Sequence, residues 1–405
     1  MIPSGPFHFG GKHAESAALK NLFAWADVRN PFSDAPFSEA LCFGIAGGIG
    51  AGYSFCPSVI RYGLGSGVSI VGRHKAYATD ASWYTGFFER VGLRTHLTET
   101  SAPGKALQNL RSEISAGRPA VVWCSRARLP FIPQFRAACD LWMHTLVIWS
   151  LDETAQQVVA GDCAATPLQL TFQELADARA GICSHKNRTL TFEPPKKLAR
   201  ETLKSAVLAG IAASARELLE PRIKTFSLPG LEILAKMMTN RTNKDGWLKV
   251  FRGGLLYAAL RDLFDSIETS GTGGSLYRSM YADFLIEAAT ITKIKALAEL
   301  AEEYRALAQA WSDFANASLP DTVPAFAETR RLLTEQWCLY VTQGAAAQNQ
   351  ISALRTQLER IDAAIRKEFP LEPGAVENLL EQLRDRMIAL HARELAAAKR
   401  LAVLK

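Results

Sequence analysis

The pattern of apolar and polar positions changes near residue 195. Before this point, apolar residues with helical spacing alternate with short apolar runs that predict strands. The predicted helices cover residues 13–28, 83–91 and 106–116, a short one begins at residue 38, and the predicted strands cover residues 94–98, 120–124, 141–149 and 157–162. Pro194 and Pro195 can neither continue a strand nor lie inside a helix, so they mark a boundary. We therefore expect a mixed α/β domain, of the α+β class, over residues 1–195.

After this boundary, nearly every apolar pattern has the helical period. The predicted helices cover residues 200–220, 228–239, 245–268, 275–315, 323–345, 347–368 and 373–404. We expect an all-α domain over residues 196–405. Its last part, residues 347–404, reads as amphipathic helices that either pack on one another or form a homodimer interface.

One predicted strand pair carries a histidine and an acid at matching positions. His144 lies eight residues before Asp152, and Asp162 lies ten residues after it. Antiparallel strands joined by a short turn align roughly equal numbers of residues on each side of that turn. We therefore expect His144 and Asp162 at the same level of the sheet. On spacing alone, the histidine can also be a core residue and the aspartate a turn residue.

Composition excludes several classes of protein. With 48% hydrophobic residues, the chain still has no apolar run of the ~18–20 residues that span a bilayer, and its first residues lack the pattern of a signal peptide. The net charge of +6 is spread evenly, which argues against a nucleic-acid interface. The seven cysteines are an odd number without metal-ligand spacing. We expect a cytoplasmic protein with no structural metal and no bound cofactor.

A glycine pair leads into the first predicted helix. Gly10 and Gly11 precede the run that begins Lys12-His13-Ala14-Glu15. The first backbone N–H groups of a helix have no intrahelical partner, and with the helix dipole they lower the pKa of a cysteine and can hold an oxyanion. Thiol enzymes place their nucleophile at such a start. Here that position is occupied by Ala14.

Two other segments are candidates for substrate binding. The glycine-rich run that contains Gly47, Gly48 and Tyr53 lacks a nucleotide-binding motif, so we interpret it as a close backbone approach or a loop that lines the substrate site. In the helical domain, Arg278 follows Gly273-Gly274 at a predicted helix start. Glycine amides and an arginine there can hold an anion. Alternatively, the segment is a helix start whose aromatic residues belong to the core.

The opening run resembles the first motif of the butirosin biosynthesis protein H family, in which a cysteine follows the histidine. The matching residues are His13, Glu15, Ser16, Ala18, Leu19, Asn21 and Leu22. The glycine-rich run that ends in Tyr53 also fits, and the segment from Gly273 to Leu285 resembles a signature of the helical domain that commonly follows in this family. The resemblance covers most of the chain. It departs from the family pattern at Ala14, which stands in place of the cysteine.

The resemblance implies a papain-like N-terminal domain and a helical C-terminal domain. It implies amide-bond formation in natural-product biosynthesis, with an acyl group moved from the phosphopantetheine thioester of a carrier protein to a small-molecule amine. In a thiol version of this site, a cysteine at position 14 would take the acyl group, His144 would activate it, and Asp162 would orient His144. His13, Glu15, Gly47, Gly48, Tyr53 and Arg278 are then the predicted substrate-binding residues. The mild positive charge suits an acidic carrier protein.

Ala14 leaves three explanations open for how the chain works. The cysteine was replaced deliberately, and the scaffold of the enzyme is intact. Alternatively, the chain is a natural pseudoenzyme that binds an acyl carrier or a small molecule without chemistry. In the third, another thiol acts, and Cys42 beside the glycine-rich run is the candidate. A hydrolase is also possible, because the same residues pass an acyl group to water when the site is wet.

Overall fold

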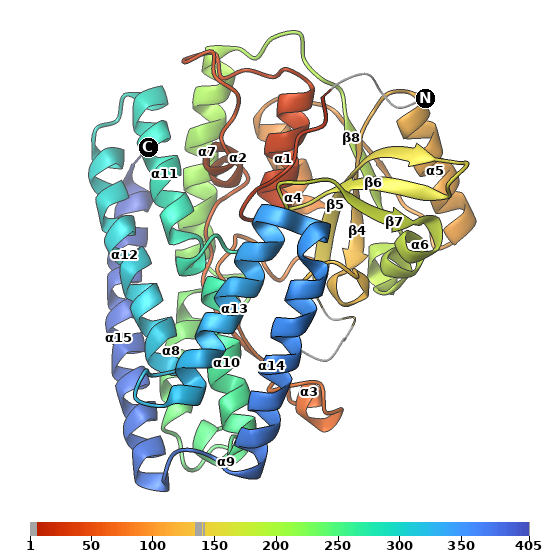
Figure 1. Ribbon diagram of the computed structural model, residues 1–405. Coiled ribbons are helices and arrows are strands. Elements are labelled where there is room, and N and C mark those ends of the chain that lie inside the picture. Colours follow the sequence, from red (N-terminus) through yellow and green to blue (C-terminus); the bar gives the residue numbers. More distant parts are fainter. Residues whose placement is uncertain (1–5, 134–139, 141, 405) are drawn as a thin grey trace.

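The computed structural model describes residues 6–133, 140 and 142–404, and it combines a sheet region with a layer of long helices (Figure 1). The sheet region contains β3 to β8 together with α1 and α4 to α6, and the long helices run side by side next to it. The predicted α+β class, with a mixed N-terminal part and a helical C-terminal part, is confirmed.

The main sheet has six strands in the order β3-β8-β4-β5-β6-β7, and every neighbouring pair is antiparallel. Its strands are β3 (Thr95–Thr98), β4 (Ala120–Ser125), β5 (Met143–Asp152), β6 (Gln157–Gly161), β7 (Leu168–Thr171) and β8 (Thr189–Phe192). A two-stranded sheet pairs β1 (Tyr53–Phe55) with β2 (Val68–Ile70). The sequence pattern predicted β3 but missed β1, β2, β7 and β8, because runs of three or four residues give only weak evidence of a period.

In Figure 1, α1 and α4 to α6 lie beside this sheet, whereas α3 lies near the lower ends of the long helices. The helices before the predicted boundary are α1 (Ala14–Trp25), α2 (Glu39–Ile45), α3 (Pro57–Arg61), α4 (Ser82–Arg90), α5 (Pro103–Ser115) and α6 (Phe172–Ala180). Those after it are α7 (Arg200–Leu219), α8 (Leu228–Met238), α9 (Trp247–Val250), α10 (Gly254–Glu268), α11 (Arg278–Thr292), α12 (Ala296–Ser318), α13 (Pro324–Gln343), α14 (Gln348–Lys367) and α15 (Pro373–Val403). The sequence pattern did not predict α3 or α6.

Two predicted long helices are each broken in two. The helix expected over residues 245–268 is interrupted at Gly253, and the one expected over residues 275–315 ends at Lys293 before a second helix begins. Both residues have a positive φ, 52° and 65°, which interrupts the helical hydrogen-bond ladder. At the second break, the apolar period continues on both sides because α11 and α12 pack against each other. The sequence pattern therefore does not show the turn between α11 and α12.

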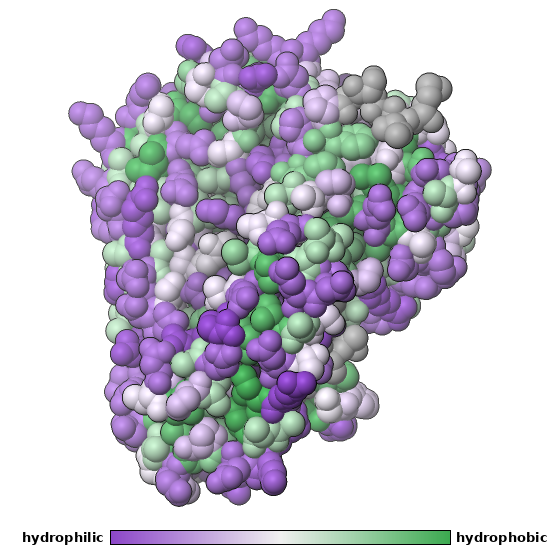
Figure 2. Space-filling view, viewed as in Figure 1, coloured by the Kyte–Doolittle hydropathy of each residue, from purple (hydrophilic) through white to green (hydrophobic). Residues whose placement is uncertain are grey.

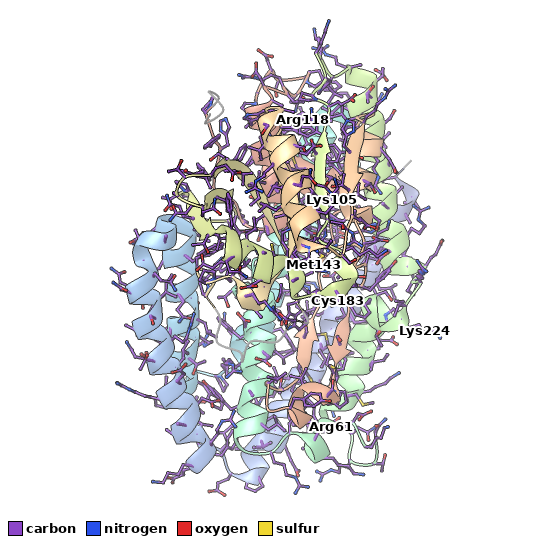
Figure 3. All side chains as sticks on the ribbon, turned by 90° about the vertical axis from the view of Figure 1, so that its right-hand side faces the viewer. Arg61, Lys105, Arg118, Met143, Cys183 and Lys224 are labelled. Carbon is purple, nitrogen blue, oxygen red and sulfur yellow. The ribbon has the colours of Figure 1, made fainter. Side chains whose placement is uncertain are left out.

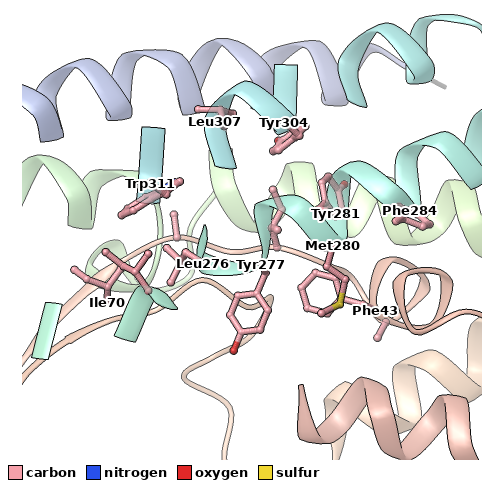
Figure 4. Packing of buried hydrophobic residues seen from close by; sticks show 14 of the residues in the cluster. Phe43, Ile70, Leu276, Tyr277, Met280, Tyr281, Phe284, Tyr304, Leu307 and Trp311 are labelled. Atoms are coloured by element: carbon pink, nitrogen blue, oxygen red, sulfur yellow. The ribbon is translucent and has the colours of Figure 1, made fainter. Parts of the chain in front are cut away.

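One continuous core joins the sheet region to the helices. Phe43 of α2 and Tyr281 and Phe284 of α11 belong to the same buried cluster (Figure 4). A Cβ added at Gly44 would lie 2.2 Å from the ring of Phe284, so the helices approach this closely only with glycine there. Because residues from both sides of position 195 share this core, helices of the C-terminal part are held against the sheet.

The face of the molecule drawn in Figure 2 carries mostly polar side chains. Figure 2 shows apolar residues gathered in a band over α13 and α14. The apolar face of α15 packs inside the same chain, against α7, α8 and α12. Within the described residues, no helix combines the length and the apolar character needed to cross a bilayer.

Candidate functional site

The loop that enters α1 is fixed by hydrogen bonds and by glycine. Gly11 donates its N–H to the carbonyl of Cys163 at 3.0 Å, and a Cβ added to Gly11 would lie 2.3 Å from that of Ala17. The Glu39 carboxylate accepts from the backbone N–H groups of Lys12 and His13, at 2.9 Å each. The glycine pair is therefore needed to bring the chain to the start of α1.

Ala14 is the first residue of α1, and His13 is the residue that precedes it. The backbone of His13 is extended, and its side chain makes no capping hydrogen bond to the first turn. The first-turn N–H groups of α1 therefore lack a side-chain cap and can serve an oxyanion. Asn21 and Lys20 hold the loop from the other side, since both donate to the carbonyl of Gly10.

His144 and Asp162 form a hydrogen-bonded pair, as the strand spacing predicts. β5 and β6 pair with Val147 opposite Gly161, which places His144 near the end of β6. The Nε2 atom of His144 lies 2.7 Å from Oδ2 of Asp162. Because this bond uses Nε2, the other ring nitrogen, Nδ1, is left for a group in the adjoining cavity.

A tyrosine from the helical part forms a second hydrogen bond to Asp162. The hydroxyl of Tyr340, on α13, donates to the same Oδ2 atom of Asp162 at 2.5 Å. Burial raises the pKa of Asp162, but His144 and then Tyr340 outweigh it and hold this pKa below its ordinary value. Asp162 is therefore an ionised, buried partner for His144. The sequence analysis missed Tyr340, because nothing in the helical period of α13 marks it.

A cavity of about 420 Å³ lies between the sheet and the helices, and both Ala14 and His144 line it. Its walls also include Cys163, Tyr277 and Tyr340. Figure 3 shows Met143, the first residue of β5, at the level where the sheet region meets the long helices. The cavity thus brings together the beginning of α1, the His144–Asp162 pair and the helical part.

His13 and Glu15 also line the cavity, in a buried charged cluster with Arg73. The Nε atom of Arg73 lies 2.5 Å from Glu15, and His13 Nε2 lies 3.3 Å from the same carboxylate. The Arg73 guanidinium also lies over the ring of Trp83, 5.5 Å from its centre. Burial raises the pKa of Glu15, but Arg73 and then His13 lower it by more than burial raises it. The pKa of Glu15 is therefore below its ordinary value. This cluster fixes one wall of the cavity beside Ala14.

Tyr277 reaches the cavity through an unusual left-handed segment. Residues 273–277 all have a positive φ, including the non-glycine residues Ser275, Leu276 and Tyr277. The ring of Tyr277 stacks on Phe43 with 5.3 Å between centroids, and it meets the ring of His13 edge-on at 5.2 Å. Figure 4 shows its hydroxyl pointing away from the helices that carry Tyr281 and Tyr304. Sequence analysis treated Tyr277 only as a possible core residue, whereas it is both buried and part of the cavity wall.

The structure does not bring Gly47, Gly48 and Tyr53 to the cavity, whose described lining omits all three. A Cβ at Gly47 would lie 2.4 Å from the His74 ring, and one at Gly48 would lie 2.5 Å from the Tyr281 ring. Tyr53 is buried and accepts a hydrogen bond from Trp247. Close packing therefore explains this glycine-rich run, in agreement with the close-approach interpretation rather than the substrate-lining one.

Arg278 is likewise placed away from the cavity, with a fully buried side chain. Its Nε donates to Glu394 of α15 at 2.7 Å, and its other nitrogens donate to the carbonyls of Leu276 and Gly50, each at 2.8 Å. With its donors engaged in this way, Arg278 ties α11 to α15 and to the loop after α2. The anion-binding role predicted for it gives way to a structural one.

Two of the described cysteines, Cys42 and Cys163, are poor nucleophiles. Cys42 is fully buried inside α2 and does not line the cavity, and burial raises the pKa of its thiol well above the ordinary value. Cys163 does line the cavity, but burial and the neighbouring Asp162 carboxylate raise its thiol pKa in the same way. Because the thiolate is the nucleophile, these environments disfavour both thiols. Among the described residues, no group of three or more His, Cys, Asp or Glu side chains could hold a metal ion.

Two family models match this chain. Residues 13–163 match the model of the family "Butirosin biosynthesis protein H, N-terminal". The chain therefore carries the N-terminal domain of the butirosin biosynthesis protein H family. Residues 173–332 match a second model, a "Domain of unknown function (DUF4872)", so the predicted succession of two family domains is confirmed. No curated protein matches the chain.

The first matched range contains three of the site residues, whereas Tyr340 lies outside both ranges. The first runs from His13 to Cys163, so it includes Ala14, His144 and Asp162. Tyr340 lies beyond both matched ranges. The end of α13 that lies beyond the second match thus supplies a hydrogen bond to the central carboxylate of this site.

Proposed function

We propose that the cavity is the reaction site of an amide-forming acyltransferase, in which an acyl group passes from the thioester of a carrier protein to an amine. The match to the N-terminal domain of the butirosin biosynthesis protein H family points to a role in biosynthesis. The observation that carries the proposal is the His144–Asp162 hydrogen bond beside the uncapped start of α1 in one shared cavity. This arrangement suits acyl transfer, because a base and oxyanion donors face the same space.

The nucleophile position of the proposed site is Ala14. In a thiol form, a cysteine there would attack the thioester carbonyl while His144 accepted the thiol proton. The resulting acyl group would then pass to the amine. The first-turn N–H groups of α1 would hold the oxyanion formed in each step.

The donor in this proposal is a phosphopantetheine thioester on an acidic carrier protein, which the net charge of +6 suits. No cofactor of the protein's own enters the reaction. The acceptor is a small-molecule amine. A carrier protein of this kind also places the proposed reaction in the cytoplasm.

The test is intact-protein mass spectrometry of the Ala14→Cys variant after incubation with acyl-pantetheine thioesters. We expect one acyl adduct at position 14 and its loss in the Ala14→Cys/His144→Ala double variant. Ala76→Cys is the matched control, because Ala76 lines the same cavity but does not begin a helix. Equal acylation of the cysteines introduced at positions 14 and 76 would contradict the proposal, because it would show reaction without activation.

A second candidate function is a binding scaffold that holds an acyl carrier or a small molecule without chemistry. The methyl group of Ala14 favours it, because no thiol stands where the reaction requires one. Under this alternative, the Ala14→Cys variant binds an acyl-pantetheine thioester but gains no mass. The same mass spectra therefore decide between the two functions.

A further inference from the structure

We infer that the chain, with Ala14 in place, transfers the acyl group directly from thioester to amine, with His144 as general base and without an acyl-enzyme. This inference rests on the proposed function. It concerns the order of the chemical steps and the role that remains for the polar residues of the cavity when position 14 has no nucleophile.

The first argument is that the described lining of the cavity holds no usable thiol, whereas the base is intact. Cys163 is the one cysteine among the described cavity-lining residues, and its side chain is buried beside the Asp162 carboxylate. His144 nevertheless keeps its bond to Asp162, and Asp162 keeps its bond to Tyr340. The machinery that moves a proton is therefore complete, although the group it would activate in a thiol enzyme is missing.

The second argument is space. An alanine methyl group is smaller than a cysteine side chain, so the cavity that Ala14 and His144 both line keeps room at the beginning of α1 where a sulfur atom would lie. The cavity volume of about 420 Å³ falls within the ~300–1,000 Å³ typical of small-molecule sites. An amine can therefore occupy the place of the thiol and present its N–H to Nδ1 of His144.

The third argument is charge stabilisation. The uncapped first turn of α1 begins at Ala14, and its backbone N–H groups do not depend on the side chain at that position. They can hold the oxygen of a tetrahedral intermediate formed by an amine as well as one formed by a thiolate. Replacing the cysteine by alanine removes the nucleophile and leaves this part of the site intact.

The reaction balances without a co-reactant. The amine nitrogen attacks the thioester carbonyl carbon and forms the C–N bond, while His144 Nδ1 takes a proton from that nitrogen. The tetrahedral intermediate then collapses, the C–S bond breaks, and the proton passes from His144 to the departing sulfur. The products are one amide and one free pantetheine thiol.

The experiment uses the unaltered chain, a pantetheine thioester that acylates the Ala14→Cys variant, and hydroxylamine as a small amine acceptor. Product is measured by liquid chromatography and mass spectrometry while both concentrations are varied. We expect intersecting initial-rate lines, no mass gain on the protein, and a fall of about 100-fold in the His144→Ala variant, within the range for general-base catalysis. The Ala14→Cys variant should instead give parallel lines and an acyl adduct.

Three results would overturn the inference, and they differ in what else they overturn. If Ala14→Cys is acylated but the unaltered chain forms no product, direct transfer is wrong and the proposed function stands. If the unaltered chain itself gains an acyl adduct that Cys163→Ala removes, transfer is covalent through that thiol. If no thioester acylates Ala14→Cys and no product forms, the proposed function and the inference fail together.

Discussion

Two buried pairs, His144–Asp162 and Arg278–Glu394, each join a basic side chain to an acidic one, but only the first lies at the cavity. Both have a nitrogen–oxygen distance of 2.7 Å. The side chains of Arg278 and Glu394 are both 0% exposed, whereas the His144 side chain is 11% exposed and lines the cavity. In the first pair, one ring nitrogen remains for a ligand. In the second, the arginine donors are bound to the protein.

The comparison teaches that a short buried ion pair does not by itself indicate a functional site. Arg278 is surrounded by Glu394, backbone carbonyls and the ring of Trp311, whose N–H also donates to Glu394. That environment fixes three segments of chain against one another. Asp162, by contrast, is hydrogen-bonded to His144 of the sheet and to Tyr340 of the helical part, and His144 lines the cavity.

The largest expected effect is on stability, from Arg278→Ala. Removing the arginine leaves the Glu394 carboxylate buried without its partner, which we expect to lower the free energy of unfolding by ~3–5 kcal/mol. Urea unfolding measures it. Arg331→Ala is the control, because Arg331 pairs with Glu328 and Glu335 at the surface, where such pairs contribute ~0–1 kcal/mol. Similar losses in both variants would remove the distinction between a sealed pair and a surface pair.

The next effect is on reaction rate, from His144→Ala. We expect amide formation by the unaltered chain to fall by about 100-fold, with the fold retained, because a general base contributes at least this much. The control is His96→Ala, since His96 lies 3.0 Å from Glu193 in an exposed pair on the sheet. Equal rates for the two variants would show that His144 has no special role.

A smaller effect on rate is expected from Tyr340→Phe. Loss of the hydroxyl removes a hydrogen bond to Asp162 and raises the pKa of this carboxyl, so we expect about a tenfold lower rate, ~1.4 kcal/mol. The acidic limb of the pH–rate profile should move to higher pH. Tyr257→Phe is the matched control, because the buried Tyr257 hydroxyl bonds to Thr329 in the helical part. A purely structural Tyr340 would lower stability in both variants and leave the profile unchanged.

The smallest effect concerns acid stability through Glu15. Because folding lowers the pKa of Glu15, the stabilisation from its carboxylate is present above the ordinary pKa and is lost as the pH falls through the folded-state pKa. Glu15→Gln lacks this titration. The free energy of unfolding should therefore fall less steeply below about pH 4.5, by up to one proton's share of the slope, when urea unfolding is repeated over a pH series. Superimposable slopes would show that Arg73 does not stabilise the charged form.

The sequence predicted the parts of the site that follow from local spacing. The pairing of β5 with β6 brought His144 to Asp162 because strand register follows from counting outward from a turn. The glycine pair before Ala14 predicted the helix start for a similar reason, since the steric demand lies within a few residues. The motif around the start of α1 also predicted that His13 and Glu15 lie at the cavity.

The remaining parts depend on contacts between distant segments. Tyr340 reaches Asp162 across 178 positions of sequence, and no periodicity encodes such a contact. Arg278 was predicted from a glycine-rich helix start, but its environment is decided by Glu394 on α15. Gly47 and Gly48 resemble a ligand loop in sequence, yet the rings of His74 and Tyr281 occupy the space that their missing side chains leave. Glycine shows that something approaches the backbone and does not show what it is.

The most direct test of the account is the reactivity of a cysteine introduced at position 14. The Ala14→Cys variant is alkylated with iodoacetamide over a range of pH, and modification at each cysteine is followed by peptide mass spectrometry. The account predicts that this thiol reacts with a midpoint within ~3.5–7.5, below the ~8.5 of a free cysteine, and that His144→Ala raises the midpoint. Cys42 and Cys163 should stay unmodified, because both are buried. A midpoint near ~8.5 that His144→Ala leaves unchanged would contradict the claim that position 14 and His144 form one site.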